Sequence, residues 1–282
     1  MRVFNYKTFF IIIILLALLV ASYFYYIHEN QKQEILFFDV GQGDAIFVNL
    51  AGNNEILIDG GPDNSVLYKL GRFMPLYDRS LELMILTHHH EDHLFGLIEV
   101  LKRYRVKKIL MYCESAKENL TDVLTEFFDL IAKEKAQILC AEDLTKLDLN
   151  SALLIMIYPK KNCAVCAADP GGNNSSLVFR LDIDQGEKIL LTGDIEEKAE
   201  KEILATNAPG ILKSDILKVP HHGSETSLIE EFLAEVSPEK AVISVGQDNK
   251  FGHPSLRTIK RLERMGVEIL RTDEMGDIII KE

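Results

Sequence analysis

Positive charge is scarce in this chain. It has 31 Lys and Arg residues against 43 Asp and Glu, which gives a net charge of −12. Arg2 and Lys7 are the only charged residues among the first 28, so the remainder carries −14. A field of that sign repels phosphate backbones, so nucleic acid could bind only at a local basic patch or through metal ions. The one dense basic stretch, KRYRVKK at 102–108, is more typical of a solvated helix end than of a nucleic-acid groove.

Low-complexity tracts and short repeats are also missing, and 47% of the residues are hydrophobic. This composition excludes a disordered chain. A length of 282 residues is enough for one large domain or two small ones with a proper core.

Cysteine is sparse, with four residues. Cys163 and Cys166 form a lone C-x-x-C with no second pair at zinc-finger spacing, which argues against a structural zinc site. Cys113 and Cys140 each end an apolar run, so on neighbouring parallel strands they could be bridged in an oxidising compartment. Four small apolar core residues are the alternative interpretation.

The longest apolar run occupies residues 9–27, FFIIIILLALLVASYFYYI, which is about the length that a helix needs to cross a bilayer. The small pair Ala21-Ser22, after a positive N-terminus, would also suit a cleaved signal peptide. The run continues past that pair into three tyrosines that are typical of a membrane interface, so we favour an uncleaved anchor over cleavage or a buried core helix.

The charges on either side of this run predict its orientation. Positive residues precede it and the acidic mixture HENQKQE follows it, which predicts a cytoplasmic N-terminus and an extracytoplasmic domain. We therefore expect two parts. Residues 1–28 form the N-terminus and the single-pass membrane anchor, and residues 29–282 form one hydrolase domain outside the cell membrane, or a secreted domain if the N-terminus is cleaved.

Short apolar, β-branched runs recur after the anchor, and helix-period segments lie between several of them at 117–134, 226–236 and 255–265. This alternation predicts an α/β fold. Polar residues follow the apolar runs, at Asp59, His88, Asp194 and His221. Seven of the eight histidines lie at 88–93, 221–222 and 253. Loops at strand ends are where α/β proteins build their sites, so we expect these residues to form one.

The stretch THHHEDH indicates a metal site. In an extended segment alternate side chains share a side, so His88, His90 and Asp92 can converge, and His93 can turn in where the next helix begins. Two pairs of ligands suit two adjacent metal ions. His89 and Glu91 would then face outward. A solvated polar turn is the alternative, which the specific spacing H-x-H-x-D-H disfavours.

The pattern H-x-H-x-D-H after a strand resembles the metallo-β-lactamase superfamily, hydrolases with a four-layer αββα sandwich and a binuclear site. By this resemblance Asp194 in LLTGD would bridge both metals, and His221 in VPHHGS would be the last histidine ligand. FFDVGQGDAIFV, NNSSLVFRL, LLTGDIEEKAE, LKVPHHGSETS and VISVGQDNKFGHPS together resemble the C-terminal hydrolase domain of the ComEC competence family. The polytopic channel region of that family is missing, since this chain has one predicted span.

One departure from the superfamily pattern concerns the metals. Many members supply a third histidine between the first cluster and the bridging aspartate, but here the corresponding loop reads DPGGNNSSL. Asn173 or Asn174 stands closest to that position, and an ordinary turn pair is nearly as good an interpretation. An amide oxygen is a weaker, harder ligand than imidazole, so this position should favour manganese over zinc.

Other residues are assigned supporting roles. The resemblance places His253 at the mouth of the site, as a transition-state stabiliser or general acid. Asp39 and Asp59 are interpreted as carboxylates that orient ligand imidazoles, although the adjacent glycines also suit plain turns. Spacing cannot choose between His221 and His222, so we take His221 as the ligand by motif position and His222 as its neighbour.

The predicted chemistry is hydrolysis assisted by two divalent ions, zinc or manganese. His88 and His90 would hold one ion, and Asp92, His93 and His221 would hold the other. Asp194 would bridge the two ions. The predicted catalytic residues are Asp92, Asp194 and His253. The leading hypothesis is a membrane-tethered phosphodiesterase or nuclease of the ComEC-like type, with DNA as substrate. The alternatives are hydrolysis of a small cell-envelope phosphoester, such as a choline phosphate, or of a lactone or β-lactam, and a non-catalytic, metal-stabilised binding protein.

Overall fold

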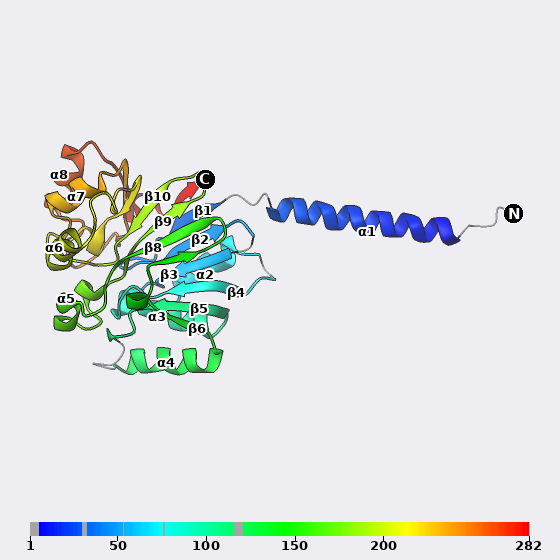
Figure 1. The fold of residues 1–282 in the computed structure, drawn as a ribbon, viewed down its shortest axis with the longest axis horizontal. Helices are drawn as coiled ribbons and strands as arrows, with labels where there is room; N and C mark the ends of the chain where they lie inside the picture. Colours follow the sequence, from blue (N-terminus) through cyan, green and yellow to red (C-terminus); the bar gives the residue numbers. More distant parts are fainter. Residues whose placement is uncertain (1–5, 30–32, 53, 76, 116–120, 282) are drawn as a thin grey trace.

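Two β-sheets packed face to face form the body of the protein (Figure 1). The computed structural model describes residues 6–29, 33–52, 54–75, 77–115 and 121–281. The first sheet has the strand order β14 (Ile278–Lys281), β1 (Glu34–Phe37), β2 (Ile46–Leu50), β3 (Asn54–Ile58), β4 (Ser80–Ile85), β5 (Arg105–Met111), β6 (Gln137–Cys140). The second has the order β13 (Glu268–Arg271), β12 (Lys240–Ile243), β11 (Ile216–Lys218), β10 (Lys188–Leu191), β9 (Val178–Ile183), β8 (Ala152–Tyr158), β7 (Lys146–Asp148).

Helices cover the outer face of each sheet. The first sheet packs against α2 (Ser65–Phe73), α3 (Glu91–Leu101) and α4 (Asp122–Glu134). The second packs against α6 (Glu197–Thr206), α7 (Glu230–Val236) and α8 (Leu256–Arg264). Shorter elements are α5 (Ala164–Ala168), α9 (Thr272–Met275) and the 3-10 turns η2 (Ala141–Asp143), η3 (Asn173–Ser175) and η4 (Pro220–Gly223). The predicted αββα sandwich is therefore confirmed. Residues 117–120 of the predicted helix at 117–134 lie outside the described residues.

The strands are apolar because both of their faces are buried. In β2, Ile46 and Val48 point into the core between the sheets, while Phe47 points toward the helices of the first sheet. Burial on both faces gives near-continuous apolar runs, which is why the strands were visible in the sequence.

The strands that lead to the polar clusters run parallel and end at the same edge. β3, β4 and β5 are parallel neighbours in the first sheet, and β10, β11 and β12 are parallel neighbours in the second. Since the carboxyl ends of parallel strands meet at one edge, the loops after β4, β10 and β11 converge there.

A close backbone approach holds α3 at this edge. A Cβ atom on Gly96 would lie 1.8 Å from the carbonyl oxygen of Gly60, so only glycine lets the helix sit against the loop after β3. The backbone N–H of Gly60 donates to the carbonyl of His93 at 2.7 Å. The first turn of α3, with Asp92 and His93, is thereby held in place.

The four cysteines form two disulfides. Cys113 and Cys140 are joined at the ends of the parallel pair β5 and β6, as the sequence allowed, and Cys163 is joined to Cys166. The interpretation of the four as small apolar core residues is therefore wrong in this structure.

The N-terminal helix α1 (Tyr6–Glu29) stands apart from the sandwich (Figure 1). Most of its described large apolar side chains are exposed, including Ile12 at 58% and Leu16 at 61%. Among the residues that the structure describes, none of the helices is long and apolar enough to span a membrane. The predicted anchor at 9–27 is therefore not confirmed, and Arg2 lies outside the described residues.

Candidate metal centre

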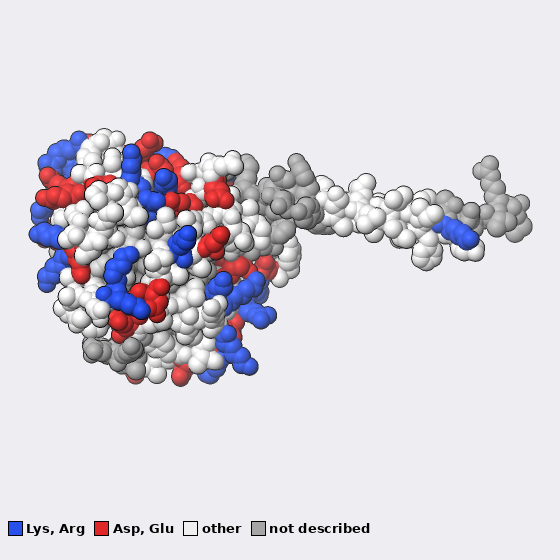
Figure 2. Space-filling view, in the orientation of Figure 1, with Lys and Arg blue, Asp and Glu red and all other residues white. Residues whose placement is uncertain are grey.

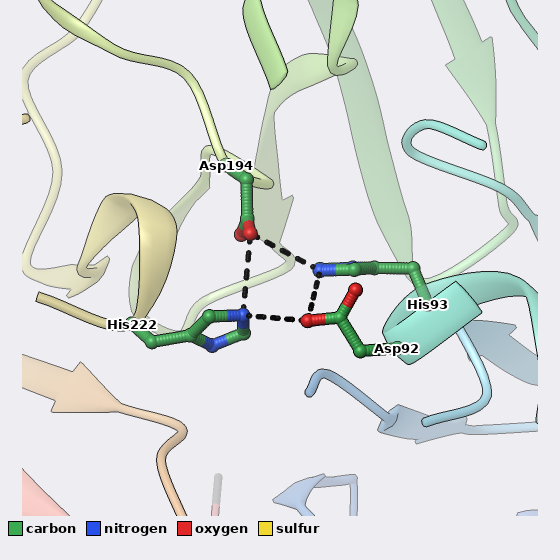
Figure 3. A group of neighbouring side chains, drawn as sticks. All are labelled: Asp92, His93, Asp194 and His222. Carbon is green, nitrogen blue, oxygen red and sulfur yellow. Dashed lines mark ion pairs between the residues drawn. The ribbon is translucent and has the colours of Figure 1, made fainter. Parts of the chain in front are cut away.

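Four side chains from the two sheets meet at the shared edge. Asp92 and His93 come from the first turn of α3, Asp194 follows β10, and His222 lies in η4 after β11 (Figure 3). One ligand atom from each lies within 4.8 Å of the others. Figure 3 shows that the four side chains point toward a common centre.

Asp194 is the centre of this group. Its Oδ2 lies 3.2 Å from Nε2 of His93 and 3.2 Å from Nε2 of His222. Nε2 of His222 also lies 3.5 Å from Oδ2 of Asp92. Asp194 and both histidines are buried, whereas Asp92 is half-buried, so the group opens to solvent on the side of Asp92.

His222, not His221, belongs to this group, which corrects the choice made from motif position. Both residues have a positive φ, +49° and +53°, so the turn of η4 is left-handed and sends the two rings in different directions. His222 points inward. His221 instead places Nδ1 3.4 Å from Oε1 of Glu196 and Nε2 3.5 Å from Nδ2 of Asn173.

His88 and His90 lie beside the group as a second pair. Their ring centroids are 4.7 Å apart, and the ring of His88 lies 4.2 Å from that of His93. His88 is buried at the end of β4, while His90 is the exposed N-cap of α3. His88, His90 and His93 therefore lie together, and Asp92 lies beside His93, at 4.0 Å between Oδ2 and Nε2.

Three buried imidazoles present a bare Nε2. The Nδ1 atom of His222 donates to the carbonyl of Ser244 at 2.8 Å, because a carbonyl can only accept. Nδ1 of His93 donates to Oδ2 of Asp59 at 2.7 Å, and Nδ1 of His88 lies 3.1 Å from Oγ1 of Thr87. Nε2 of all three is buried; that of His88 makes no hydrogen bond to any described residue, and those of His93 and His222 face only the carboxylates of the group.

Asp59 contacts the ring of His93, as the predicted orienting role would require. It is fully buried with φ of +56°, and its carboxylate accepts from the backbone N–H and the hydroxyl of Thr87, at 2.8 and 2.6 Å. These donors leave the His93 proton on Nδ1, which directs Nε2 toward Asp194. Burial raises the pKa of Asp59, and the contact with His93 opposes that rise.

Asp39 does not have this role. Its Oδ1 accepts from the backbone N–H of Gly41 at 3.2 Å, which is the turn alternative. The other acid of DVGQGD, Asp44, lies at the site: it is buried, and its Oδ1 is 3.5 Å from Nδ1 of His222. The prediction thus named the wrong carboxylate of that motif.

A buried lysine beneath the group was missed altogether. Lys218 ends β11 and is fully buried, and its Nζ makes a short ion pair with Oδ2 of Asp44. The same Nζ donates to the carbonyl of Gly193 at 3.1 Å and lies 3.4 Å from Oδ1 of Asp194. Because Asp44 belongs to the first sheet and Lys218 to the second, the pair joins the two halves of the site.

Asn173, Asn174 and His253 lie around the rim. Asn174 supports the loop, since its Oδ1 accepts from the backbone N–H of Glu196 at 3.2 Å, while Asn173 faces His221. The ring of His253 lies 5.5 Å from that of His221. Burial, followed by the nearby histidines, lowers the pKa of His253 to about 4, so at neutral pH its ring is neutral and suits hydrogen bonding better than proton donation.

The charges around the group favour a cation at its centre. Burial alone would lower the pKa of His222, but Asp194 and Asp92 outweigh it and raise the pKa to about 9. Burial alone would raise the pKa of Asp92, but His222 and His93 lower it to about 2. Carboxylates that stabilise positive charge on an imidazole also stabilise a metal ion in its place.

The residues present fit a divalent metal. The bare Nε2 atoms of His93 and His222, with the carboxylates of Asp92 and Asp194, supply the nitrogen and oxygen donors that zinc and manganese accept. His88 and His90 could hold a second ion with Asp194. Each buried imidazole also has its Nδ1 fixed by a partner, as ligand histidines usually do.

The comparisons with known proteins agree with this fold. The model of the metallo-beta-lactamase superfamily matches residues 38–117, and ComE operon protein 3 of Bacillus subtilis is 30% identical over 87% of this chain. The chain belongs to the metallo-β-lactamase superfamily. Within it, competence protein ComA of Neisseria gonorrhoeae is 29% identical over 86% of the chain. The match covers 32% and 31% of these two relatives, so the chain spans about a third of their length.

Solved structures of the superfamily share the fold. Igni18, a metallo hydrolase from Ignicoccus hospitalis, has a TM-score of 0.54 at 14% identity, over 89% of this chain and 100% of its own. A long form RNase Z from yeast also has 0.54, at 15% identity, over 90% of this chain and 42% of its own. At these identities the likeness concerns the fold alone.

Proposed function

We propose that the chain is a metal-dependent phosphodiesterase that acts on nucleic acid, with DNA as the leading candidate. The observation that carries the proposal is a pair of buried imidazoles, His93 and His222, whose Nδ1 atoms are held by partners and whose Nε2 atoms face Asp194 beside Asp92. The relatives with competence names support a nucleic-acid substrate, because the chain resembles them along most of its length.

Two divalent ions, when bound, would activate water for attack and offset the negative charge that develops on phosphate oxygens. The chain supplies the geometry. Asp194 would help to hold the ions, because its carboxylate faces His93 and His222 and acts electrostatically on His88. Asp92, which is half-buried, marks the open side through which a phosphodiester can approach.

The remaining residues hold and orient this machinery. Asp59 and the Ser244 carbonyl fix the tautomers of His93 and His222, so no reorientation is needed before a ligand binds. His253 lies next to His221 at the rim, where its neutral ring can donate a hydrogen bond to a phosphate oxygen or a leaving group.

The test is hydrolysis by the full chain, purified without metal and then supplied with manganese or zinc. Labelled single- and double-stranded DNA, bis-p-nitrophenyl phosphate and nitrocefin are the substrates. Metal-dependent cleavage of DNA and of the phosphodiester, lost in Asp194→Asn, is expected. Hydrolysis of nitrocefin alone would assign a lactamase instead, and no hydrolysis with metal bound would remove the enzyme proposal.

We also propose that residues 9–27 attach the domain to the cytoplasmic membrane, with residues 29–282 outside. The exposed apolar side chains of α1 support attachment, and the two disulfides are typical of an oxidising compartment. Alkaline carbonate extraction of membranes and protease treatment of intact cells test these two points separately. Release by carbonate would contradict attachment, and protection from protease would contradict the outside location.

A further inference from the structure

An open pocket lies next to the metal centre. It has a volume of about 600 Å³ and is formed by the start of α6, the loop after η4 and the start of α8. The residues that line it are Glu196, Glu197, Lys198, Lys201, Glu225, Thr226 and Arg257.

Glu196 connects the pocket to the metal centre. It follows Asp194 by two residues, and its Oε1 accepts from the hydroxyl of Thr226 at 2.8 Å and lies 3.4 Å from Nδ1 of His221. Since His221 precedes His222, the wall of the pocket begins one or two residues from the group that would hold metal. A ligand at the metal centre could therefore extend directly into the pocket.

Two cations in the pocket make no direct contact with an acid of the described chain, although Arg257 acts on Glu197 at longer range. Lys198 and Arg257 are exposed, and neither makes an ion pair or a hydrogen bond with any residue in the described part of the chain. Lys201 differs, because its Nζ pairs with Glu197 at 2.5 Å and neutralises that acid. Of the acids, Glu196 is held by Thr226 and by the amide of Asn174.

In the basic stretch at 102–108, Arg105 and Lys108 make no ion pair with any described residue, but they lie on β5 and do not line this pocket. Lys102 and Arg103 both pair with Glu99, and Lys107 pairs with Glu82. On the face shown in Figure 2, Lys and Arg are interspersed with Asp and Glu over the body and do not form one broad basic surface. Local cations beside the metal centre are therefore the sites where an acidic chain could hold phosphate.

We propose that this pocket binds the phosphodiester strand of the substrate beyond the phosphate that is cleaved, with Lys198 and Arg257 contacting phosphate oxygens. The inference rests on the proposed function and makes it more specific, since a polymer would use the pocket and a small phosphoester would not. Contacts from lysine and arginine to phosphates position a strand without selecting its sequence, so binding should not depend on base composition.

The test compares two double charge reversals in the full chain loaded with metal. The first is Lys198→Glu with Arg257→Glu in the pocket. The control is Arg105→Glu with Lys108→Glu in β5, where both side chains are exposed and free of ion pairs within the described residues. Both variants change the net charge by the same amount, so a general electrostatic effect would act on both.

Binding of a fluorescent single-stranded oligonucleotide with phosphorothioate linkages is measured by anisotropy over a range of salt concentrations. Loss of two phosphate contacts should weaken binding roughly tenfold or more and make the slope of log affinity against log salt shallower by about 1.4. The control should keep the slope of the unmodified chain. Turnover of bis-p-nitrophenyl phosphate should be the same in all three proteins, because this substrate does not reach the pocket.

Each outcome is decisive. Equal losses in both variants, an unchanged slope in the pocket variant, or failure of the unmodified chain to bind the oligonucleotide would overturn the inference. Failure of the proposed function looks different, because bis-p-nitrophenyl phosphate would then not be hydrolysed by any of the proteins, whatever the oligonucleotide binding shows.

Discussion

Replacing His222 with alanine should destroy metal binding, whereas the same change at His221 should largely spare it. His222 supplies one of the four ligand atoms that lie within 4.8 Å of one another, and His221 lies outside that group. Removing a residue that only orients a ligand costs about 10–100-fold in metal affinity. Removing the ligand itself should exceed the upper end of that range, which corresponds to a loss of more than about 2.7 kcal/mol.

The assay is competition with a chromogenic chelator, together with the metal content of each dialysed protein. Thermal unfolding of the metal-free proteins is the control, because His222→Ala also leaves the Ser244 carbonyl without its donor, at a cost of about 1–3 kcal/mol. The comparison is therefore made at a temperature where both variants are folded. If His221→Ala lost the metal and His222→Ala kept it, the assignment from the turn geometry would be wrong.

Three further predictions concern stability, measured by urea unfolding. Lys218→Met should lower the free energy of unfolding by about 3–5 kcal/mol, because it leaves Asp44 buried without its cation. Adding Asp44→Leu should recover most of that loss, and no recovery would contradict a simple charge pair. The Cys113–Cys140 disulfide spans 27 residues, so replacing both cysteines with serine should lower the free energy of unfolding by about 3.5 kcal/mol through chain entropy. Cys163 and Cys166 are three residues apart, and an equal loss on replacing that pair would refute the entropic explanation. Burial raises the pKa of Glu200 to about 7, so the folded state binds its proton more tightly than the unfolded state does, and stability from this group falls as the pH rises from 4.5 to 7. Glu200→Gln removes this pH dependence, so the stability of the variant relative to the unmodified chain should increase by up to about 3 kcal/mol between pH 4.5 and 7. A difference in stability that does not change with pH would contradict this prediction.

The sandwich and the first half of the site could be predicted because their signals are local. Strands buried on both faces appear as continuous apolar runs, and His88, His90, Asp92 and His93 lie within six residues on one strand-to-helix connection. Their convergence follows from the geometry of that single connection. Nothing from the second sheet is needed to place them.

The choices that failed depended on contacts between distant segments or on backbone angles. Whether His221 or His222 points inward is decided by two consecutive left-handed residues, which the letters VPHHGS do not specify. Asp39 accepts from the backbone of its own turn, whereas Asp44 pairs with Lys218 of the second sheet, a distant contact that the motif does not specify. Lys218 had a usable signal, since a lysine inside the apolar run DILKVP must find a buried carboxylate if that strand is central.

The local charge balance would allow the proposed phosphate chemistry in so acidic a chain. Four aspartates gather at the site: Asp44, Asp59, Asp92 and Asp194. Among the described residues, Lys218 is the only buried lysine beside them. Buried carboxylates in such number require positive charge from elsewhere, and two divalent ions would supply it. The ions that the carboxylates need would then attract a phosphodiester locally, while the acidic surface repels polyanions everywhere else. The net charge of −14 on residues 29–282 would therefore confine the proposed nucleic-acid substrate to the metal centre and its neighbouring pocket rather than exclude it.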